Sequence, residues 1–182
     1  GELVGRSGPN GAGKTTTFNM LTGVYAPTVG TITFNGKSIG GLDPYKVTRG
    51  GISRTFQNIR LFKELSVLDN VKVANHSLAK HNLVSSILRL PSHFSGEVKM
   101  EEESLAFLKI FGLDVYRDEL AKNLPYGMQR RLEIARALAA GPKLLLLDEP
   151  AAGMNPQETH DLMELIAFIR KEFNLTILLI EH

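Results

Sequence analysis

The segment GPNGAGKT at residues 8–15 follows a short apolar stretch and precedes residues that favour a helix. It matches a pattern of two glycines separated by four residues and followed by lysine and a hydroxyl residue. Glycine lets backbone N–H groups curl around phosphate oxygens, where a Cβ would intrude. We therefore predict a phosphate-binding loop that holds a nucleotide through Gly8, Pro9, Asn10, Gly11, Ala12, Gly13, Lys14, Thr15 and Thr16.

Lys14 and Thr15 complete the chemistry that this pattern predicts. The ammonium group of Lys14 would reach the β- and γ-phosphates of ATP, and the Thr15 hydroxyl would bind Mg²⁺. The competing interpretation is an ordinary glycine-rich turn with a surface lysine. The placement between a predicted strand and a predicted helix argues against that interpretation.

Two adjacent carboxylates, Asp148 and Glu149, follow the apolar run at residues 144–147. Such a run is typical of a parallel strand buried on both faces, and open α/β sheets bind ligands at the carboxyl ends of their strands. Phosphoryl transfer requires a carboxylate near magnesium and a group that orients the attacking water. We assign Asp148 to the first role, through the water shell of the ion, and Glu149 to the second, as general base. Alone, two acids would more often be a solvated strand end, but the phosphate-loop pattern favours the catalytic interpretation.

The elements around these motifs alternate between strand and helix. Residues 2–5 and 52–56 are typical of strands, and Asn35-Gly36 predicts a β hairpin. From residue 57 to residue 140 the pattern is mostly helical. The helix between the last two apolar strands has apolar residues at a period of 3.6, namely Leu162, Ile166, Ile169 and Phe173.

This order predicts an α/β fold, a P-loop NTPase (RecA-like) core with a parallel sheet, an antiparallel β hairpin and an inserted α-helical subdomain. We assign residues 1–56 and 141–182 to the core and residues 57–140 to the helical subdomain. Apolar strands stand at both ends of the sequence. We expect both to be central strands and interpret the chain as one domain truncated at both ends.

The composition of the chain argues against several classes of function. The 182 residues carry a formal net charge of +2, which gives little support to a nucleic-acid surface. There are no cysteines, so disulfides and thiolate metal sites are excluded. No apolar run approaches the roughly 18 residues of a transmembrane helix.

Taken with LPYGMQRR at residues 124–131, these motifs resemble the ATP-binding cassette (ABC) family along the whole chain. The resemblance places Gln57 in the Q-loop, which touches Mg²⁺ and reports to membrane subunits. It places residues 152–155 in the D-loop and His182 where a switch histidine contacts the γ-phosphate. It also implies catalytic roles for Glu149, Lys14, Gln57 and His182, and a magnesium site of Thr15, Gln57 and Asp148.

The signature segment, residues 124–128, explains a second predicted helix start far from the phosphate loop. In the ABC family this segment presents backbone N–H groups to ATP held by a second ATPase subunit, so two subunits enclose two ATP molecules head to tail. The resemblance thus implies contacts in trans from Tyr126, Gly127, Met128 and Asn155. Pro125, Tyr126 and Met128 depart from the common LSGGQ pattern, whereas Gly127 keeps its second glycine.

Asn155 also has a purely structural interpretation. Residues 155–158, Asn-Pro-Gln-Glu, match an N-cap, a proline at the first helical position and a capping glutamate. A cap and a contact in trans can coexist.

The YG signature, together with RTFQNIRLFKELSVLDNV and LLLLDEPAAGMNP, is similar to the ATP-binding subunits of branched-chain amino acid importers. This resemblance implies transmembrane permease partners, an indirect extracytoplasmic amino-acid-binding protein and a location at the cytoplasmic face of the membrane. Residues 59–65, IRLFKEL, mix apolar and basic side chains where the family docks its membrane partner; core packing is the alternative.

Other function classes fit less well. An ABC-type ATPase for another cargo, or one acting on DNA or ribosomes, remains the alternative. The latter needs a long coiled coil or a basic interface, and residues 57–124 show no sustained heptads, so no nucleic-acid partner is expected. A regulator that does not hydrolyse nucleotide would be expected to lack Glu149.

Overall fold

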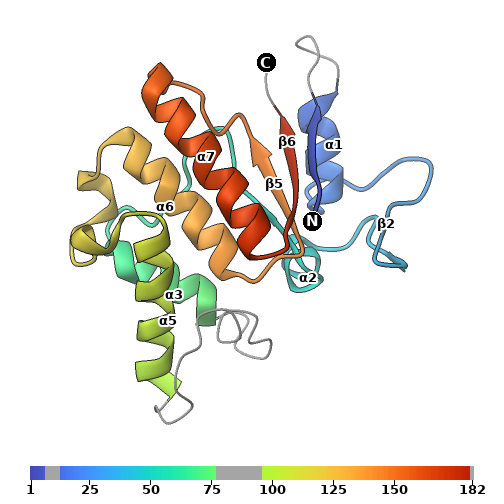
Figure 1. The fold of residues 1–182 in the computed structure, drawn as a ribbon. Coiled ribbons are helices and arrows are strands. Elements are labelled where there is room, and N and C mark those ends of the chain that lie inside the picture. Colours follow the sequence, from blue (N-terminus) through green and yellow to red (C-terminus); the bar gives the residue numbers. More distant parts are fainter. Residues whose placement is uncertain (7–12, 77–95, 181–182) are drawn as a thin grey trace.

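The structure is a computed structural model that describes residues 1–6, 13–76 and 96–180 (Figure 1). None of the helices in these ranges is long and apolar enough to cross a membrane. In chain order the elements are β1 (Leu3–Arg6), α1 (Lys14–Leu21), β2 (Thr33–Phe34), β3 (Lys37–Ser38), α2 (Pro44–Arg49), β4 (Ile52–Arg54), α3 (Val67–His76), α5 (Gly96–Ile110), η1 (Asp114–Tyr116), η2 (Ala121–Asn123), α6 (Tyr126–Ala139), β5 (Leu144–Asp148), α7 (Pro156–Glu172) and β6 (Thr176–Ile180).

Four parallel strands form the sheet in the order β1-β6-β5-β4. The apolar runs of β5 and β6 lie inside it, as their composition predicts. Among the described strands β1 lies at an edge, because it pairs only with β6 and leaves Leu3 and Val4 44% and 46% exposed. The central position expected for this strand stays a prediction. Since all four strands run in the same direction, their carboxyl ends meet at one edge.

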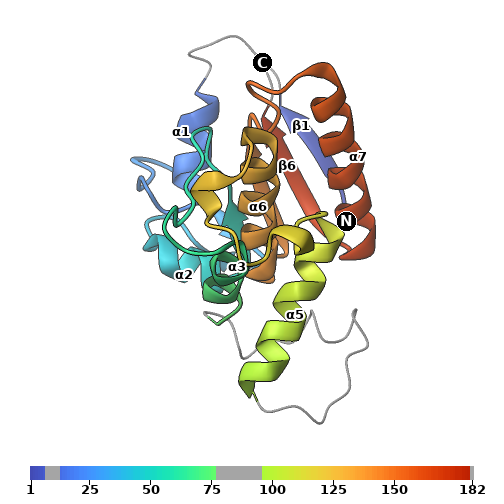
Figure 2. The same ribbon diagram turned by 90° about the vertical axis from the view of Figure 1, so that its left-hand side faces the viewer.

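Helices cover both faces of the sheet (Figure 2). Leu145 and Leu147 of β5 point into a core formed with α3, α5, α6 and α7. Leu146 points the other way, into a smaller core with Phe18 of α1 and Val47 of α2. This alternation is the period of two expected of a strand, and it makes β5 the support shared by the two layers.

The hairpin and the helical layer follow the predicted pattern. Strands β2 and β3 pair antiparallel around Asn35 and Gly36, whose φ angles of 49° and 75° are those of a tight two-residue turn. Helices α3, α5 and α6 pack beside the sheet, with Val71, Phe107 and Leu132 fully buried between them.

Candidate nucleotide site

Helix α1 begins at Lys14, directly after the predicted phosphate loop. Gly13 has a φ of 74°, in the left-handed region that favours glycine, while a Cβ there would meet no atom within 4 Å. The requirement for glycine is therefore conformational. Lys14 is 6% exposed, and Thr15 and Thr16 are exposed on the first turn. The other predicted loop residues, Gly8, Pro9, Asn10, Gly11 and Ala12, lie outside the described residues, as does His182.

Asp148, at the carboxyl end of β5, forms a buried ion pair with Arg54 of β4. The distance from Arg54 Nη2 to Asp148 Oδ2 is 2.7 Å, and each side chain is 5% exposed. The sequence predicted Asp148 as a carboxylate of the magnesium site and did not identify Arg54. An arginine within an otherwise buried strand was the available signal, because such a charge needs a counter-charge.

Arg54 also connects the sheet to α1. Its Nη1 donates to Asn19 Oδ1 at 2.6 Å, and its guanidinium carbon lies 5.3 Å from the ring centre of Phe18 and 4.8 Å from that of Phe56. One side chain therefore holds the helix that starts at Lys14 against the strand that ends at Asp148.

Replacing Arg54 with methionine is expected to lower the free energy of unfolding by about 3–5 kcal/mol, because Asp148 would lose its buried counter-charge. Urea unfolding followed by circular dichroism measures this loss. Arg117→Met is the matched control, since its ion pair with Glu101 is 40% and 43% exposed and should contribute only about 0–1 kcal/mol. Equal losses in the two variants would contradict the assigned importance of the buried pair.

Gln57 and Glu149, predicted from separate motifs, come together at the same edge of the sheet. Gln57 Nε2 donates to Glu149 Oε2 at 3.0 Å. Glu149 has a φ of 45°, uncommon for a residue with a side chain, and its N–H donates to the Ile180 carbonyl at 3.0 Å. Such backbone strain clusters at functional sites, where the surrounding structure maintains it.

Behind Gln57 lies a second buried ion pair, Arg130–Glu133 of α6, with a distance of 2.7 Å and exposures of 0% and 2%. Arg130 Nη1 and Nη2 donate to the carbonyls of Phe56 and Gln57, each at 2.7 Å. No motif in the sequence placed Arg130 at the site. Glu133 was not identified.

Burial raises the pKa of the Glu133 carboxyl, although Arg130 and the backbone N–H of Arg60 act in the opposite direction. The N–H of Arg60 donates to Glu133 Oε1 at 3.1 Å. The Glu133 carboxylate therefore accepts hydrogen bonds from two segments: from Arg130 in its own helix and from the chain that follows Gln57.

The signature segment forms the start of α6. Pro125 is the N-cap and makes no side-chain hydrogen bond to the first turn. The Tyr126 hydroxyl donates to the Ala152 carbonyl at 3.0 Å. A Cβ on Gly127 would lie 3.3 Å from Glu158 Oε1, and Met128 packs against the helical core. The start of α6 thus lies against the segment before α7, through Tyr126 and Ala152, and against Glu158 in the first turn of α7.

The capping interpretation of Asn155 is confirmed. Its side chain accepts from the Glu158 N–H at 2.9 Å, and its own N–H donates to Glu158 Oε2 at 3.0 Å. Asn155 is exposed, so the cap leaves part of the residue at the surface.

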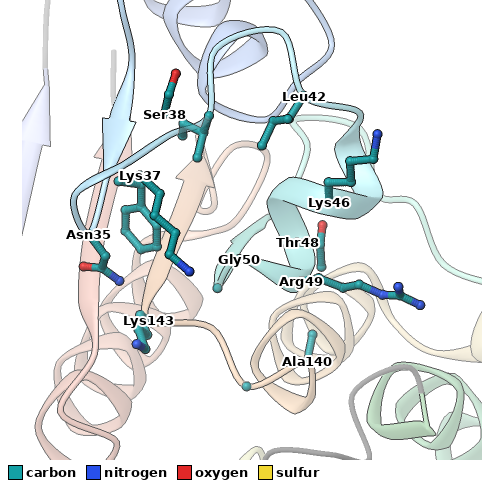
Figure 3. Close-up of a pocket in the computed structure, with 14 residues that line it drawn as sticks. Asn35, Lys37, Ser38, Leu42, Lys46, Thr48, Arg49, Gly50, Ala140 and Lys143 are labelled. Carbon is teal, nitrogen blue, oxygen red and sulfur yellow. The ribbon is translucent and has the colours of Figure 1, made fainter.

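A separate basic hollow of about 860 Å³ lies between the β2–β3 hairpin, α2 and the end of α6 (Figure 3). Lys37, Lys46, Arg49 and Lys143 contribute its cations. None of the predicted site residues that the structure describes lines this hollow. The candidate site is therefore the sheet edge with Asp148 and Glu149.

A helix that starts with lysine after a glycine turn, beside adjacent acids at the carboxyl edge of a parallel sheet, defines a nucleotide-binding protein of the P-loop class. The sequence model of a protein family described as "ABC transporter" matches residues 1–152 of the chain. The chain belongs to the ABC transporter family, and its ATPase class is that of the ABC cassettes.

Relatives and solved structures agree with this assignment. LivG of Salmonella typhimurium, a high-affinity branched-chain amino acid transport ATP-binding protein, is 49% identical over 181 residues, covering 100% of this chain and 71% of LivG. The ADP conformation of MJ1267, an ATP-binding cassette of an ABC transporter, gives a TM-score of 0.78 at 32% identity, over 99% of this chain and 68% of that one. A dimeric post-hydrolysis state of the ATP-binding cassette MJ0796 bound to ADP and Pi gives a TM-score of 0.78 at 27% identity, over 100% of this chain and 75% of that one.

Proposed function

We propose that this chain is the ATP-hydrolysing subunit of an importer that takes up the branched-chain amino acids leucine, isoleucine and valine. The proposal of ATP hydrolysis is supported by the hydrogen bond from Gln57 Nε2 to Glu149 Oε2, at 3.0 Å. This bond lies at the sheet edge that also holds Asp148. The cargo rests on the 49% identity to LivG, a branched-chain amino acid transport protein.

Magnesium is the cofactor that fits the residues at this edge. Thr15, Gln57 and Asp148 offer hydroxyl, amide and carboxylate oxygens, the ligands that Mg²⁺ prefers. Gln57 directs its amide nitrogen toward Glu149, so its side-chain carbonyl oxygen can face a cation. Mg²⁺ bound with ATP would neutralise the charge that develops on the phosphates.

Side chains of the protein carry out the other steps of ATP binding and hydrolysis. Lys14 binds the β- and γ-phosphates of ATP, and residues 8–16 hold the phosphates through the loop and the first turn of α1. Glu149 accepts the proton of the attacking water, Gln57 holds the Glu149 carboxylate in place, and His182 contacts the γ-phosphate.

A second ATPase subunit, identical or related, completes each site. The N-cap Pro125 offers no side-chain acceptor to the first turn of α6, so backbone N–H groups there can meet an anion. Tyr126, Gly127, Met128 and Asn155 would then face ATP held by the other subunit. The dimeric state of the similar cassette MJ0796 supports this arrangement.

The membrane partners are permease subunits, which place the chain at the cytoplasmic face of the membrane. Within residues 59–65, Phe62 and Leu65 are 49% and 37% exposed, whereas Leu61 packs against the helical core. Phe62 and Leu65, which follow Gln57 closely in the chain, are therefore apolar side chains that a permease segment could cover. An extracytoplasmic amino-acid-binding protein would deliver the cargo.

Uptake of labelled leucine, isoleucine and valine tests the whole proposal. Cells that carry Lys14→Ala in the intact gene are expected to lose uptake of these three amino acids, because ATP no longer binds productively. Lys37→Ala, which removes an exposed lysine of the hairpin, is the control and should transport normally.

The outcomes separate the two parts of the proposal. Selective loss of uptake supports both the ATPase and the cargo. Unchanged uptake, with the mutant protein present and the unsubstituted protein active as an ATPase, would remove the cargo and leave the ATPase.

A further inference from the structure

We infer that Tyr126 and Arg130 are positioning residues that join the start of α6 to the segments carrying Gln57 and Asn155, so that the two ATP sites of a dimer are mechanically linked. The inference rests on the proposed function, because it concerns how one subunit serves two nucleotides. Three segments distant in sequence meet at these two side chains.

The first contact joins α6 to the chain before and at Gln57. Arg130 is fully buried and donates to two successive carbonyls, those of Phe56 and Gln57. Two bonds from one planar guanidinium fix the direction of the peptide groups, which the single ammonium of lysine would not do. Glu133 holds the guanidinium in place from the next turn of the helix.

The second contact joins α6 to the segment that leads into α7. The Tyr126 hydroxyl donates to the Ala152 carbonyl at 3.0 Å and accepts from Arg130 Nη2 at 3.3 Å. The tyrosine ring lies against Gly153, where an added Cβ would come 3.6 Å from Cε1. Residues 152–153 immediately precede Met154 and the cap at Asn155.

Through these contacts, hydrogen bonds at the start of α6 join the residues that serve the subunit's own ATP to those that serve the ATP of the other subunit. Gln57 holds Glu149, which acts on the ATP of the same subunit, while Tyr126 and Asn155 face the ATP of the other subunit. A displacement of the α6 start therefore moves the backbone of Gln57 through Arg130 and the D-loop through Tyr126. Hydrogen-bond networks of this kind can carry coupling between distant sites.

Tyr126→Phe tests the link with little risk to folding, because it removes only a hydroxyl from a side chain that is 45% exposed. We expect kcat for ATP to fall about fivefold, the effect of losing roughly 1 kcal/mol of one hydrogen bond. The affinity for ATP and the thermal midpoint should not change, because Lys14 and the core are untouched and phenylalanine keeps the backbone N–H that position 126 would offer to the ATP of the other subunit. Tyr45→Phe, on α2 and 57% exposed, is the control and should match the unsubstituted protein in every measurement.

A double variant, Arg130→Leu with Glu133→Leu, removes the first contact, from Arg130 to the carbonyls of Phe56 and Gln57, without leaving a buried charge. Because both side chains are buried, at 0% and 2% exposure, and neither is among the proposed ATP contacts, a fall in kcat at constant ATP affinity in this variant would support positioning rather than direct contact. Unchanged kcat in Tyr126→Phe, or a loss that only follows the thermal midpoint, would overturn the inference. Absence of ATP turnover in the unsubstituted protein made from the intact gene would overturn the proposed function instead.

Discussion

Lys14→Ala is expected to weaken ATP binding by between tenfold and more than a hundredfold. A hydrogen bond between charged groups contributes about 1.5–3 kcal/mol, and each 1.4 kcal/mol is a factor of ten in affinity. Lys14 is 6% exposed at the first position of α1, so its side chain is held within the protein at the start of the helix. Equilibrium titration with a fluorescent ATP analogue measures the change.

Two comparisons make this result specific to Lys14. Lys37→Ala removes a lysine from the hairpin, away from the sheet edge, and should bind nucleotide normally. Thermal unfolding without nucleotide separates lost binding from lost folding. Normal affinity in a folded Lys14→Ala protein would contradict the assignment of the phosphate loop.

Features set by local sequence were predictable. The turn at Asn35 and Gly36 depends on two residues that tolerate positive φ. The cap at Asn155 depends on Glu158 three residues later. The buried strands β5 and β6 follow from continuous apolar runs. In each case the residues that determine the structure lie within a few positions of one another.

The buried charges were not predictable in the same way. Arg54 meets Asp148 across 94 positions, and Arg130 meets the Gln57 carbonyl across 73. The strand around Arg54 indicates that its charge needs a partner, but no local pattern identifies Asp148, and none distinguishes Arg130 from a partly exposed arginine such as Arg117. The partner is chosen by strand order and helix packing. The edge position of β1 among the described strands likewise depends on which strands pair, not on its apolar composition.

Glu149→Gln is expected to lower ATP turnover by about 10²–10⁴-fold, the usual contribution of a general base. A glutamine amide oxygen can still accept from Gln57 Nε2, as Glu149 Oε2 does at 3.0 Å. The site geometry is therefore kept while the proton acceptor is lost. ATP affinity should remain, because Lys14 and residues 8–16 are unchanged.

With hydrolysis blocked, the proposed pair of subunits should remain closed on ATP. Light scattering coupled to gel filtration in saturating Mg-ATP is expected to give a dimer for Glu149→Gln, and Glu164→Gln, an exposed substitution on α7, should keep normal turnover. A monomeric Glu149→Gln protein with bound ATP would contradict completion of the site in trans. Undiminished turnover would contradict the role of general base, and the strained φ of 45° at Glu149 would then need another explanation.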